Sequence, residues 1–138
     1  MLSNKKGSAE IVAFILVLPV LLFPVFNTFH VYMDLYKYNM LKQVAREALL
    51  RMEVTGGLTE EDKDRILDYL EDRNFERSNI HLDYTPHPVE FGEEIAFRIT
   101  YNYTQVRYTF GIGGIQRVEK NSSMVYGPLK STSKYYDN

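Results

Sequence analysis

The sequence predicts an α+β fold in which a long N-terminal, membrane-spanning helix precedes a short second helix and a small antiparallel sheet of about three strands. Three observations predict it: an uncharged apolar segment near the N-terminus, apolar residues at spacings of three and four beyond it, and alternating apolar and polar residues in the second half of the chain. The predicted parts are a basic cytoplasmic leader at 1–7, a long helix at 8–54 that spans a membrane over about 11–33, an exported α+β head at 55–130, and a flexible or partner-ordered tail at 131–138.

Composition excludes several classes of protein. The 138 residues are 45% hydrophobic and 25% charged, which places the chain outside the disordered class. A formal net charge of −2 supplies no basic surface for phosphates, so direct binding of duplex nucleic acid is not expected. The chain has no cysteine, which excludes disulfides, thiolate zinc sites and cysteine nucleophiles.

The apolar segment begins at Ile11, contains no charged residue as far as Phe26 and continues to Met33 with mildly polar interruptions. It amounts to about 23 residues, enough for a helix to cross roughly 30 Å of hydrocarbon. Lys5 and Lys6 are the first charged residues of the chain. The positive-inside rule therefore predicts a cytoplasmic N-terminus and a head outside the cytoplasmic membrane.

A cleaved secretory signal is the alternative interpretation of this segment. Signal peptidase requires small residues at A-x-A spacing after the apolar core, but no alanine lies between Ala13 and Ala45. The sequence therefore favours a retained membrane helix.

The helix is expected to continue outside the membrane as an amphipathic segment. The apolar residues at helical spacing are Val31, Leu35, Tyr38, Leu41, Val44, Ala45, Ala48, Leu49 and Met52. Thr55, Gly56 and Gly57 should then end the helix, because glycine readily adopts the left-handed conformation that follows a helix. A helix from Ser8 to Val54 would be roughly 70 Å long.

This apolar stripe needs a covering surface, and the sheet can provide it. We expect Leu41, Val44, Ala48 and Met52 to pack on the inner face of the sheet, against Phe97, Ile99 and Tyr101.

A second helix is predicted at Thr59–Phe75. Thr59 is a capping residue, and the three acids that follow it suit a helix N-terminus. Ile66, Leu67, Leu70 and Phe75 give this helix one modest apolar face. The acidic run lacks the ligand spacing and the glycine of an EF-hand loop, so no metal site is predicted there.

Strands are predicted where apolar and polar residues alternate, at 80–85 and 95–104. After Gln105 the apolar phase slips, which indicates a bulge or bend. The glycine-rich segment Phe110–Ile115 is expected to be a hairpin loop, and Arg117–Tyr126 is expected to be extended. No phosphate-binding helix follows these glycines, so they do not form a nucleotide fingerprint.

The sequence does not predict an enzyme, a cofactor or a metal centre. His30, His81 and His87 lack the spacing of metal ligands, and adjacent Glu93 and Glu94 would face opposite ways on a strand. No G-x-S-x-G nucleophile motif is present.

Two further sequence features leave their role open. The eleven tyrosines are accounted for either by packing or by a subunit interface. Asn102–Thr104 and Asn121–Ser123 match N-x-S/T, a motif too short to assign a glycan.

The segment Lys5-Lys6-Gly7-Ser8-Ala9-Glu10, followed at once by an apolar helix containing LVLPVLL, resembles type IV pilin-like proteins, and among them the TadE-like pseudopilins. The later QVAREA at 43–48 and Thr-Gly-Gly at 55–57 are similar to the place where that family's helix enters its small α+β head. The resemblance covers roughly 3–57, and it extends to the head by architecture only.

The resemblance implies that a prepilin peptidase cuts between Gly7 and Ser8, and that mature helices pack together in a filament core. In many such pilins the glutamate is fifth after the cut, whereas Glu10 would be third. Its carboxylate would either meet the freed Ser8 amine of a neighbouring subunit or lie among lipid headgroups beside the lysines. The residues expected to act in assembly are Glu10, Phe14, Leu16, Pro19, Leu22 and Pro24.

Pro19 and Pro24 remove two helix donors and predict a kink, which in a pilus could permit stretching of the core.

The expected function is that of a non-enzymatic structural subunit that enters the membrane and assembles through its N-terminal helix into an extracellular or envelope-spanning filament. By resemblance, its partners are other copies of itself, a prepilin peptidase and a pilus assembly platform, with the lipid bilayer as its environment before assembly. Two alternatives stay open: a permanently anchored accessory protein of a secretion or conjugation machine, and a membrane-tethered enzyme or binding domain.

Overall fold

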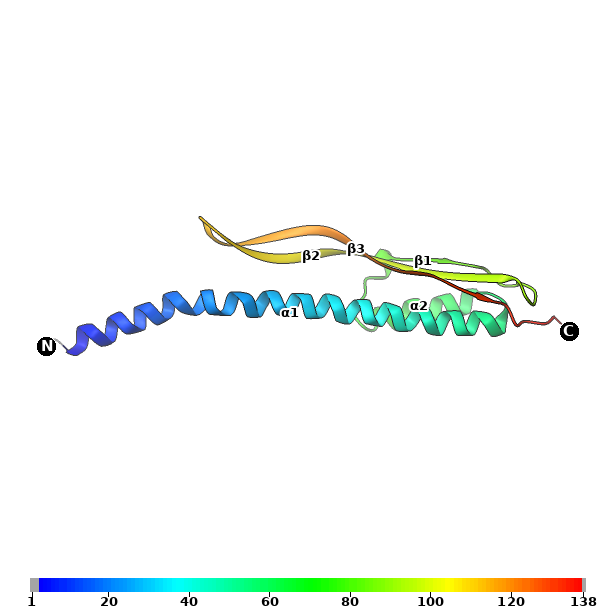
Figure 1. Ribbon diagram of the computed structural model, residues 1–138, viewed down its shortest axis with the longest axis horizontal. Coiled ribbons are helices and arrows are strands. Elements are labelled where there is room, and N and C mark those ends of the chain that lie inside the picture. The colour runs from blue at the N-terminus through cyan, green and yellow to red at the C-terminus, as the bar shows by residue number, and fades with distance from the viewer. Residues whose placement is uncertain (1–2, 138) are drawn as a thin grey trace. The chain divides into compact units, whose positions relative to one another are not determined.

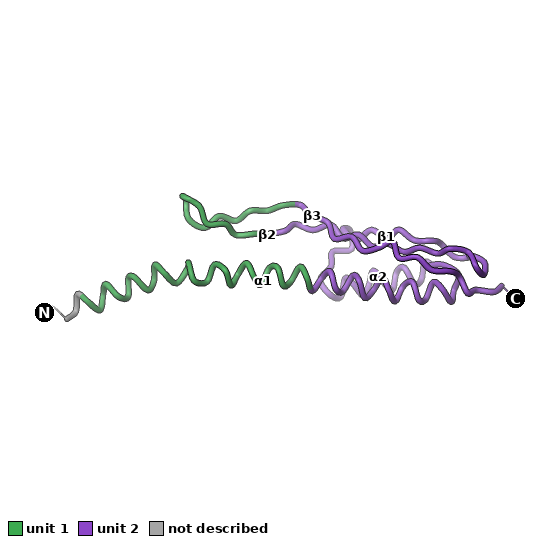
Figure 2. Tube along the Cα trace, in the orientation of Figure 1, with its two compact units in different colours: residues 1–35, 106–120 green, residues 36–105, 121–138 purple. Residues whose placement is uncertain are grey.

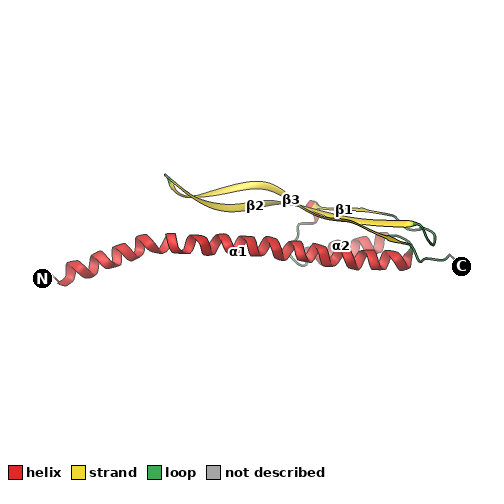
Figure 3. Cartoon of the chain, in the orientation of Figure 1, coloured by secondary structure: helices red, strands yellow, loops and turns green. Residues whose placement is uncertain are grey.

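The structure is a computed structural model that describes residues 3–137 of the chain. Its elements, in order, are α1 (Ser3–Thr55), α2 (Glu60–Glu71), the 3-10 turn η1 (Arg77–Asn79), β1 (Ile80–Tyr84), β2 (Glu94–Gly111) and β3 (Gly114–Thr132) (Figure 1). The strands form one antiparallel sheet in the order β1-β2-β3 (Figure 3). This confirms the α+β class, the long apolar N-terminal helix, the short second helix and the three-stranded sheet.

The chain divides into two compact units (Figure 2). Unit 1 comprises Met1–Leu35 and Val106–Lys120, so it contains the apolar part of α1 and the outer part of the β2–β3 hairpin. Unit 2 comprises Tyr36–Gln105 and Asn121–Asn138, so it contains the rest of α1, α2 and most of the sheet. The boundary within β2 falls at Gln105, where the apolar phase of the sequence slips.

α1 is longer than the sequence predicted at its N-terminal end, because it begins at Ser3 and not at Ser8. It ends at Thr55, one residue beyond the predicted end at Val54. Gly56 has a φ of +68°, and the backbone N–H of Gly57 donates to the carbonyl oxygen of Met52 at 3.0 Å. This is the hydrogen bond of a Schellman motif, which partners a carbonyl of the last helical turn.

α2 begins where the sequence predicted, with Thr59 as its cap: the side chain of Thr59 accepts from the backbone N–H of Asp62 at 3.2 Å. It ends earlier, at Glu71, and not near Phe75. Asn74 has a φ of +63°, and the N–H of Phe75 donates to the carbonyl of Leu70. The chain thereby turns the Phe75 ring back into the core, where it makes an edge contact with another ring.

The sheet register places alternate residues of β1 and β2 on the same face. Ile80 pairs with Tyr101, and Leu82 pairs with Ile99. The β2–β3 turn is tighter than the predicted loop, because the strands reach Gly111 and restart at Gly114. Only two residues connect the strands, the commonest length for a hairpin.

The hydrophobic core lies in unit 2 and joins helix and sheet residues. It contains Leu41, Val44, Ala45, Ala48, Met52, Leu58, Leu70, Phe75, Ile80, Ile95, Phe97, Ile99, Tyr101 and Met124. The predicted packing of the outer half of α1 on the sheet is therefore confirmed, since all seven residues named for it are members of this cluster.

The end of the chain is held against the head, in contrast to the expected flexible or partner-ordered tail. β3 continues to Thr132, and Ser133 is buried with its hydroxyl donating to the carbonyl of Val89 at 2.9 Å. The backbone N–H of Lys134 donates to the carbonyl of Glu53 at 2.7 Å. These contacts are polar, so the hydrophobic pattern of the sequence did not reveal them.

Candidate assembly surface

The residues expected to act in processing and assembly all lie on the unit 1 part of α1. Gly7 and Ser8 are exposed and lie within the helix. Apart from the neighbouring residues and the backbone of the helix itself, no atom of the described residues lies within 4 Å of the position that a Cβ would take at Gly7. Glu10 is also exposed. Phe14, Leu16, Pro19, Leu22 and Pro24 follow on the same helix, all of them exposed.

The apolar part of α1 leaves large side chains uncovered on all sides. Phe14 is 63% exposed and Leu16 is 69% exposed, and no residue of the most apolar 18-residue window is buried. That window has a mean hydropathy of 2.6. A helix that is apolar all round is stable only in the interior of an assembly or in a membrane. By length and composition α1 is able to cross a membrane, although a signal sequence would have the same properties.

Two prolines modify the hydrogen bonding of this surface. Pro19 and Pro24 lie inside α1, and the helix continues through both. Each lacks the N–H that would bind the carbonyl four residues earlier. The hydroxyl of Thr28 donates to the carbonyl of Pro24 at 2.8 Å. The carbonyls four residues before Pro19 and Pro24, which lack these N–H partners, can accept hydrogen bonds from neighbouring helices.

Asn27 forms a contact that sequence reasoning missed. Its side-chain amide donates to the carbonyl of Tyr108 at 3.0 Å, and its side-chain oxygen accepts from the N–H of Tyr108 at 3.2 Å. The ring of His30 lies 5.6 Å from the Tyr108 ring. The Asn27 side chain therefore pairs with both backbone groups of Tyr108, the N–H and the C=O, as the backbone of a neighbouring strand does. A lone amide at the end of an apolar run was the only indication in the sequence.

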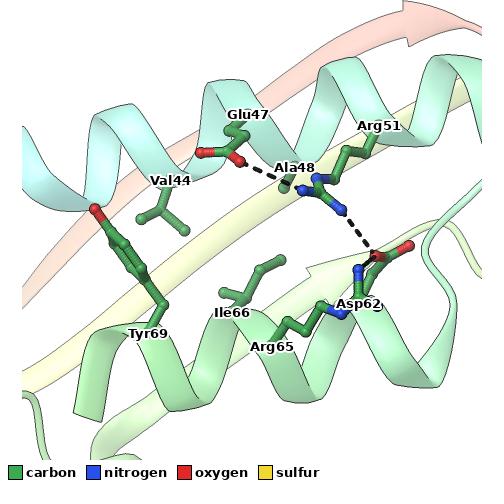
Figure 4. A pocket seen from close by; sticks show the side chains of 8 residues that line it. All are labelled: Val44, Glu47, Ala48, Arg51, Asp62, Arg65, Ile66 and Tyr69. Atoms are coloured by element: carbon green, nitrogen blue, oxygen red, sulfur yellow. Dashed lines mark hydrogen bonds and ion pairs between the residues drawn. The ribbon is translucent and has the colours of Figure 1, made fainter. Parts of the chain in front are cut away.

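A groove in unit 2 lies between α1 and α2 (Figure 4). Its lining residues are Val44, Glu47, Ala48, Arg51, Asp62, Arg65, Ile66 and Tyr69. Arg51 contacts Asp62 at 3.4 Å and Glu47 at 3.7 Å, while Thr59 donates to Asp62 at 2.9 Å. The Asp62 carboxylate thus takes part in an ion pair with Arg51 and a hydrogen bond with the Thr59 hydroxyl. This arrangement links the two helices.

The end of α1 carries a charged contact with the C-terminal segment. Lys134 donates to the Glu53 carboxylate at 2.6 Å, and the Ser131 hydroxyl donates to its other oxygen. The hydrogen bond from Lys134, then that from Ser131, lower the pKa of Glu53. Burial opposes this shift and the charge of Lys134 adds to it.

The histidines and acids singled out in the sequence do not converge. His87 Nδ1 lies 2.6 Å from the carbonyl of Thr55, and its ring makes an edge contact with Tyr135. His30 is in unit 1, whereas His81 is an exposed residue of β1 in unit 2. Within residues 3–137 no group of three or more His, Asp or Glu side chains is placed to hold a metal ion.

The two N-x-S/T motifs lie side by side on β2 and β3, where both line a polar hollow with Asn79. The Thr104 hydroxyl is 3.5 Å from the side-chain oxygen of Asn121. Among the tyrosines, Tyr101 is buried in the core and stacks on Tyr103, whereas Tyr136 is 65% exposed and stacks on Phe91.

Comparisons with models of protein families, with curated proteins and with solved structures found no match for this chain.

Proposed function

We propose that this protein is a non-enzymatic, pilin-like structural subunit. It enters the cytoplasmic membrane through α1, with its head outside, and assembles through the same helix into an extracellular or envelope-spanning filament. The observation that carries the proposal is the difference in burial along α1. One face of the unit 2 part is buried in a core, whereas the apolar part from Ile11 to Phe26 is largely exposed.

The membrane stage rests on hydropathy and charge. The apolar segment from Ile11 to Met33 is long enough to cross the hydrocarbon layer, and Lys5 and Lys6 precede it. Protease added to intact protoplasts should therefore remove the head. A head that survives there but is digested in lysed cells would reverse the proposed orientation.

The assembly stage rests on what happens to α1 outside lipid. Its apolar side chains then need neighbours, and the same segment of other copies offers a matching surface. Glu10 would need a cation in such a core, and the freed amine of Ser8 on the neighbouring subunit would supply one. The carbonyls left by Pro19 and Pro24 would accept bonds from adjacent helices or permit local stretching.

The decisive experiment determines the N-terminal residue of the protein recovered from sheared surface filaments. If the proposal is correct, this residue is Ser8. A protein that retains Met1 and stays with the membrane after shearing would instead be a permanently anchored accessory subunit.

A pair of glycine variants sharpens this test. Gly7→Val should block cleavage and filament formation, because the cut would follow Gly7. Gly111→Val is the matched control, since both glycines have open space around the added side chain. Equal processing of the two variants would contradict the assigned cleavage position.

A further inference from the structure

The part of the β2–β3 hairpin that belongs to unit 1, Val106–Lys120, is called the outer hairpin below, and two contacts hold it against α1 (Figure 2). The side chain of Asn27 pairs with the backbone N–H and C=O of Tyr108. Closer to the turn, Ile115 lines a hollow together with Phe23. Because Phe23 precedes Asn27 on the helix, the outer hairpin runs back along α1 toward the N-terminus.

The turn of the outer hairpin lies level with the middle of the apolar segment Ile11–Met33. β2 continues past Tyr108 to its end at Gly111, which is about 10 Å of extended chain. Along a helix the same length corresponds to about seven residues. Since Tyr108 is bound to Asn27, the turn lies near Val20.

Charged side chains of the outer hairpin are exposed at the level of this segment. The two-residue turn sets Arg117 opposite Tyr108 across the hairpin, and therefore at the level of Asn27. Arg117 pairs with Glu119, and the two side chains are 60% and 52% exposed. If α1 spanned a bilayer with the hairpin docked on it, this ion pair would face hydrocarbon, where charged groups are costly.

The backbone of the outer hairpin presents the same difficulty. Among the described strands, the order β1-β2-β3 leaves the far edge of β3 without a neighbour, and β1 pairs with β2 only between Phe97 and Tyr101. Asn27 supplies partners to Tyr108 at the edge of β2 that β1 leaves open. Water satisfies the N–H and C=O groups of a sheet edge, but hydrocarbon does not. The docked hairpin is therefore incompatible with lipid around this part of α1.

We propose that the outer hairpin takes two positions: it lies away from α1 and outside the hydrocarbon while the helix spans the membrane, and it docks on α1 after the helix leaves lipid. This inference rests on the proposed insertion of α1. In the docked position Phe23, Asn27 and His30 are partly buried, whereas Leu22 and Phe29 stay exposed on another face of the helix. Docking therefore determines which face of α1 is available to neighbouring copies, and it occurs only in subunits that have left the bilayer.

Spin labels can follow this movement, because the chain has no cysteine of its own. Full-length protein is labelled at Phe26→Cys and Ile115→Cys, two positions that line the same hollow. Double electron–electron resonance measures the distance between the two labels in vesicles of phosphatidylcholine and phosphatidylglycerol. The same measurement is made in sheared filaments, in which an excess of unlabelled protein removes distances between subunits.

Two further labelled proteins serve as controls. Glu94→Cys with Lys130→Cys is the matched pair, since these exposed side chains are in contact between β2 and β3 in unit 2. A single label at Leu16→Cys reports membrane insertion. Its collisions are measured with oxygen, which concentrates in lipid, and with a nickel chelate, which stays in water.

The expected result is a short distance between the labels at positions 26 and 115 in filaments, which is replaced in vesicles by a long and broad distribution. The control pair should keep its short distance in both samples. If the distance between positions 26 and 115 stays short in vesicles while the Leu16→Cys label collides with oxygen, the hairpin enters the bilayer with α1. That outcome would overturn the inference and leave the proposed insertion intact.

Two other outcomes are also informative. A long distance between positions 26 and 115 in the filaments as well would show that the hairpin does not dock after α1 leaves lipid, and would overturn the inference. A Leu16→Cys label that collides with the nickel chelate in vesicles would overturn the proposed membrane insertion itself.

Asn27→Ala tests the contact that holds the docked hairpin. In filaments it should shift the distances between the two labels toward the long and broad distribution, because it removes both hydrogen bonds to Tyr108. Thr28→Ala is the matched control, since the Thr28 hydroxyl bonds within α1, to the carbonyl of Pro24. Equal distributions for the two variants would contradict the role assigned to Asn27.

Discussion

The position after α1 requires glycine, because a side chain at Gly56 would have no room. Its φ of +68° is in the left-handed region, and a Cβ would lie 2.6 Å from the carbonyl oxygen of Val89 and 2.7 Å from the Cβ of Tyr135. These neighbours come from the connection before β2 and from the C-terminal segment. Because glycine has only a hydrogen atom as its side chain, the end of α1, the connection before β2 and the C-terminal segment can come close together at Gly56.

Gly56→Ala should lower the free energy of unfolding of the head by about 3 kcal/mol, since backbone strain and overpacking act together. Gly92→Ala is the control, because Gly92 has a φ of +85° but open space around it. The control should lose only about 1 kcal/mol from strain. Urea titration of full-length protein in detergent, followed by tyrosine circular dichroism, measures both. Equal losses would show that the close contacts at Gly56 do not matter.

Glu53 makes the head sensitive to acid. Its pKa is lowered in the folded state by Lys134 and Ser131, so its contribution to stability is present above the ordinary glutamate pKa of about 4.3 and is lost as pH falls through the lower folded value. Glu53→Gln should therefore be less stable than the wild type at pH 7, and the difference should shrink as the pH falls below about 4. Urea titrations across this range measure it.

Glu94→Gln provides the matched control for Glu53. Glu94 pairs with Lys130, but both side chains are well exposed, so removing the pair should change stability little. A difference between wild type and Glu53→Gln that stays constant with pH would contradict the assigned role of the Glu53 carboxylate.

At the scale of elements, periodicity made the helices and strands predictable, because burial of one face sets the repeat of apolar residues. The apolar stripe from Leu41 to Met52 and the alternating pattern of the strands together predicted that α1 packs on the sheet. Features held by polar or backbone contacts gave no such pattern. The Asn27 contact with Tyr108, the docking of Ser133 and the early end of α2 at Glu71 each depend on a hydrogen bond between residues that the hydropathy of the sequence does not distinguish.

The assembly residues show the same limit from the other side. Hydropathy predicted an exposed apolar helix around Leu16 and Leu22, and the structure has these side chains exposed. What they bind is a property of other molecules. Neither the chain's own fold nor its composition contains that information, so it stays a prediction.

The unit 2 part of α1 should behave as a core element. Val44 is 5% exposed and belongs to the cluster of buried residues, so Val44→Asp would place an unpaired carboxylate in the core. The expected loss of stability is several kcal/mol, about 3–5 by analogy with broken buried pairs. Leu50→Asp, on the same helix but 63% exposed, is the matched control. A Val44→Asp protein that unfolds at the same urea concentration as Leu50→Asp would refute this packing.

At the scale of the whole molecule, the two units differ in how much apolar surface they expose. Unit 2 encloses its apolar side chains in a core that α1, α2 and the sheet share. Unit 1 leaves most of the uncharged run exposed, together with Phe110 and Ile112 at the β2–β3 turn. Under the proposed function, transfer from membrane to filament would exchange the surroundings of unit 1 and leave the head folded.

Assembly should therefore depend on the apolar part of α1 more than on the head. Burial of this surface contributes about 25 cal/mol per Å², and a charge at its centre would have to be buried with it. Leu16→Lys should abolish filaments while the head keeps its fold. Leu50→Lys is the matched control, because both leucines lie on α1 and are similarly exposed, by 69% and 63%. Electron microscopy of sheared fractions and circular dichroism of the purified proteins measure the two properties.

A chain that begins near Tyr36 tests the same dependence by removal. It retains the core of unit 2 and lacks the apolar run, so it should be soluble and mostly monomeric in sedimentation experiments, whereas the full-length protein in detergent should self-associate. The retained β2–β3 turn, where Phe110, Ile112 and Ile115 are exposed, could still cause association, and Ile112→Ser in the shortened chain would reduce its apolar surface. If the shortened chain forms filaments, or if full-length Leu16→Lys does, the helix does not provide the assembly interface. The interface would then have to lie on the head, where the exposed stack of Phe91 and Tyr136 would be the first surface to mutate.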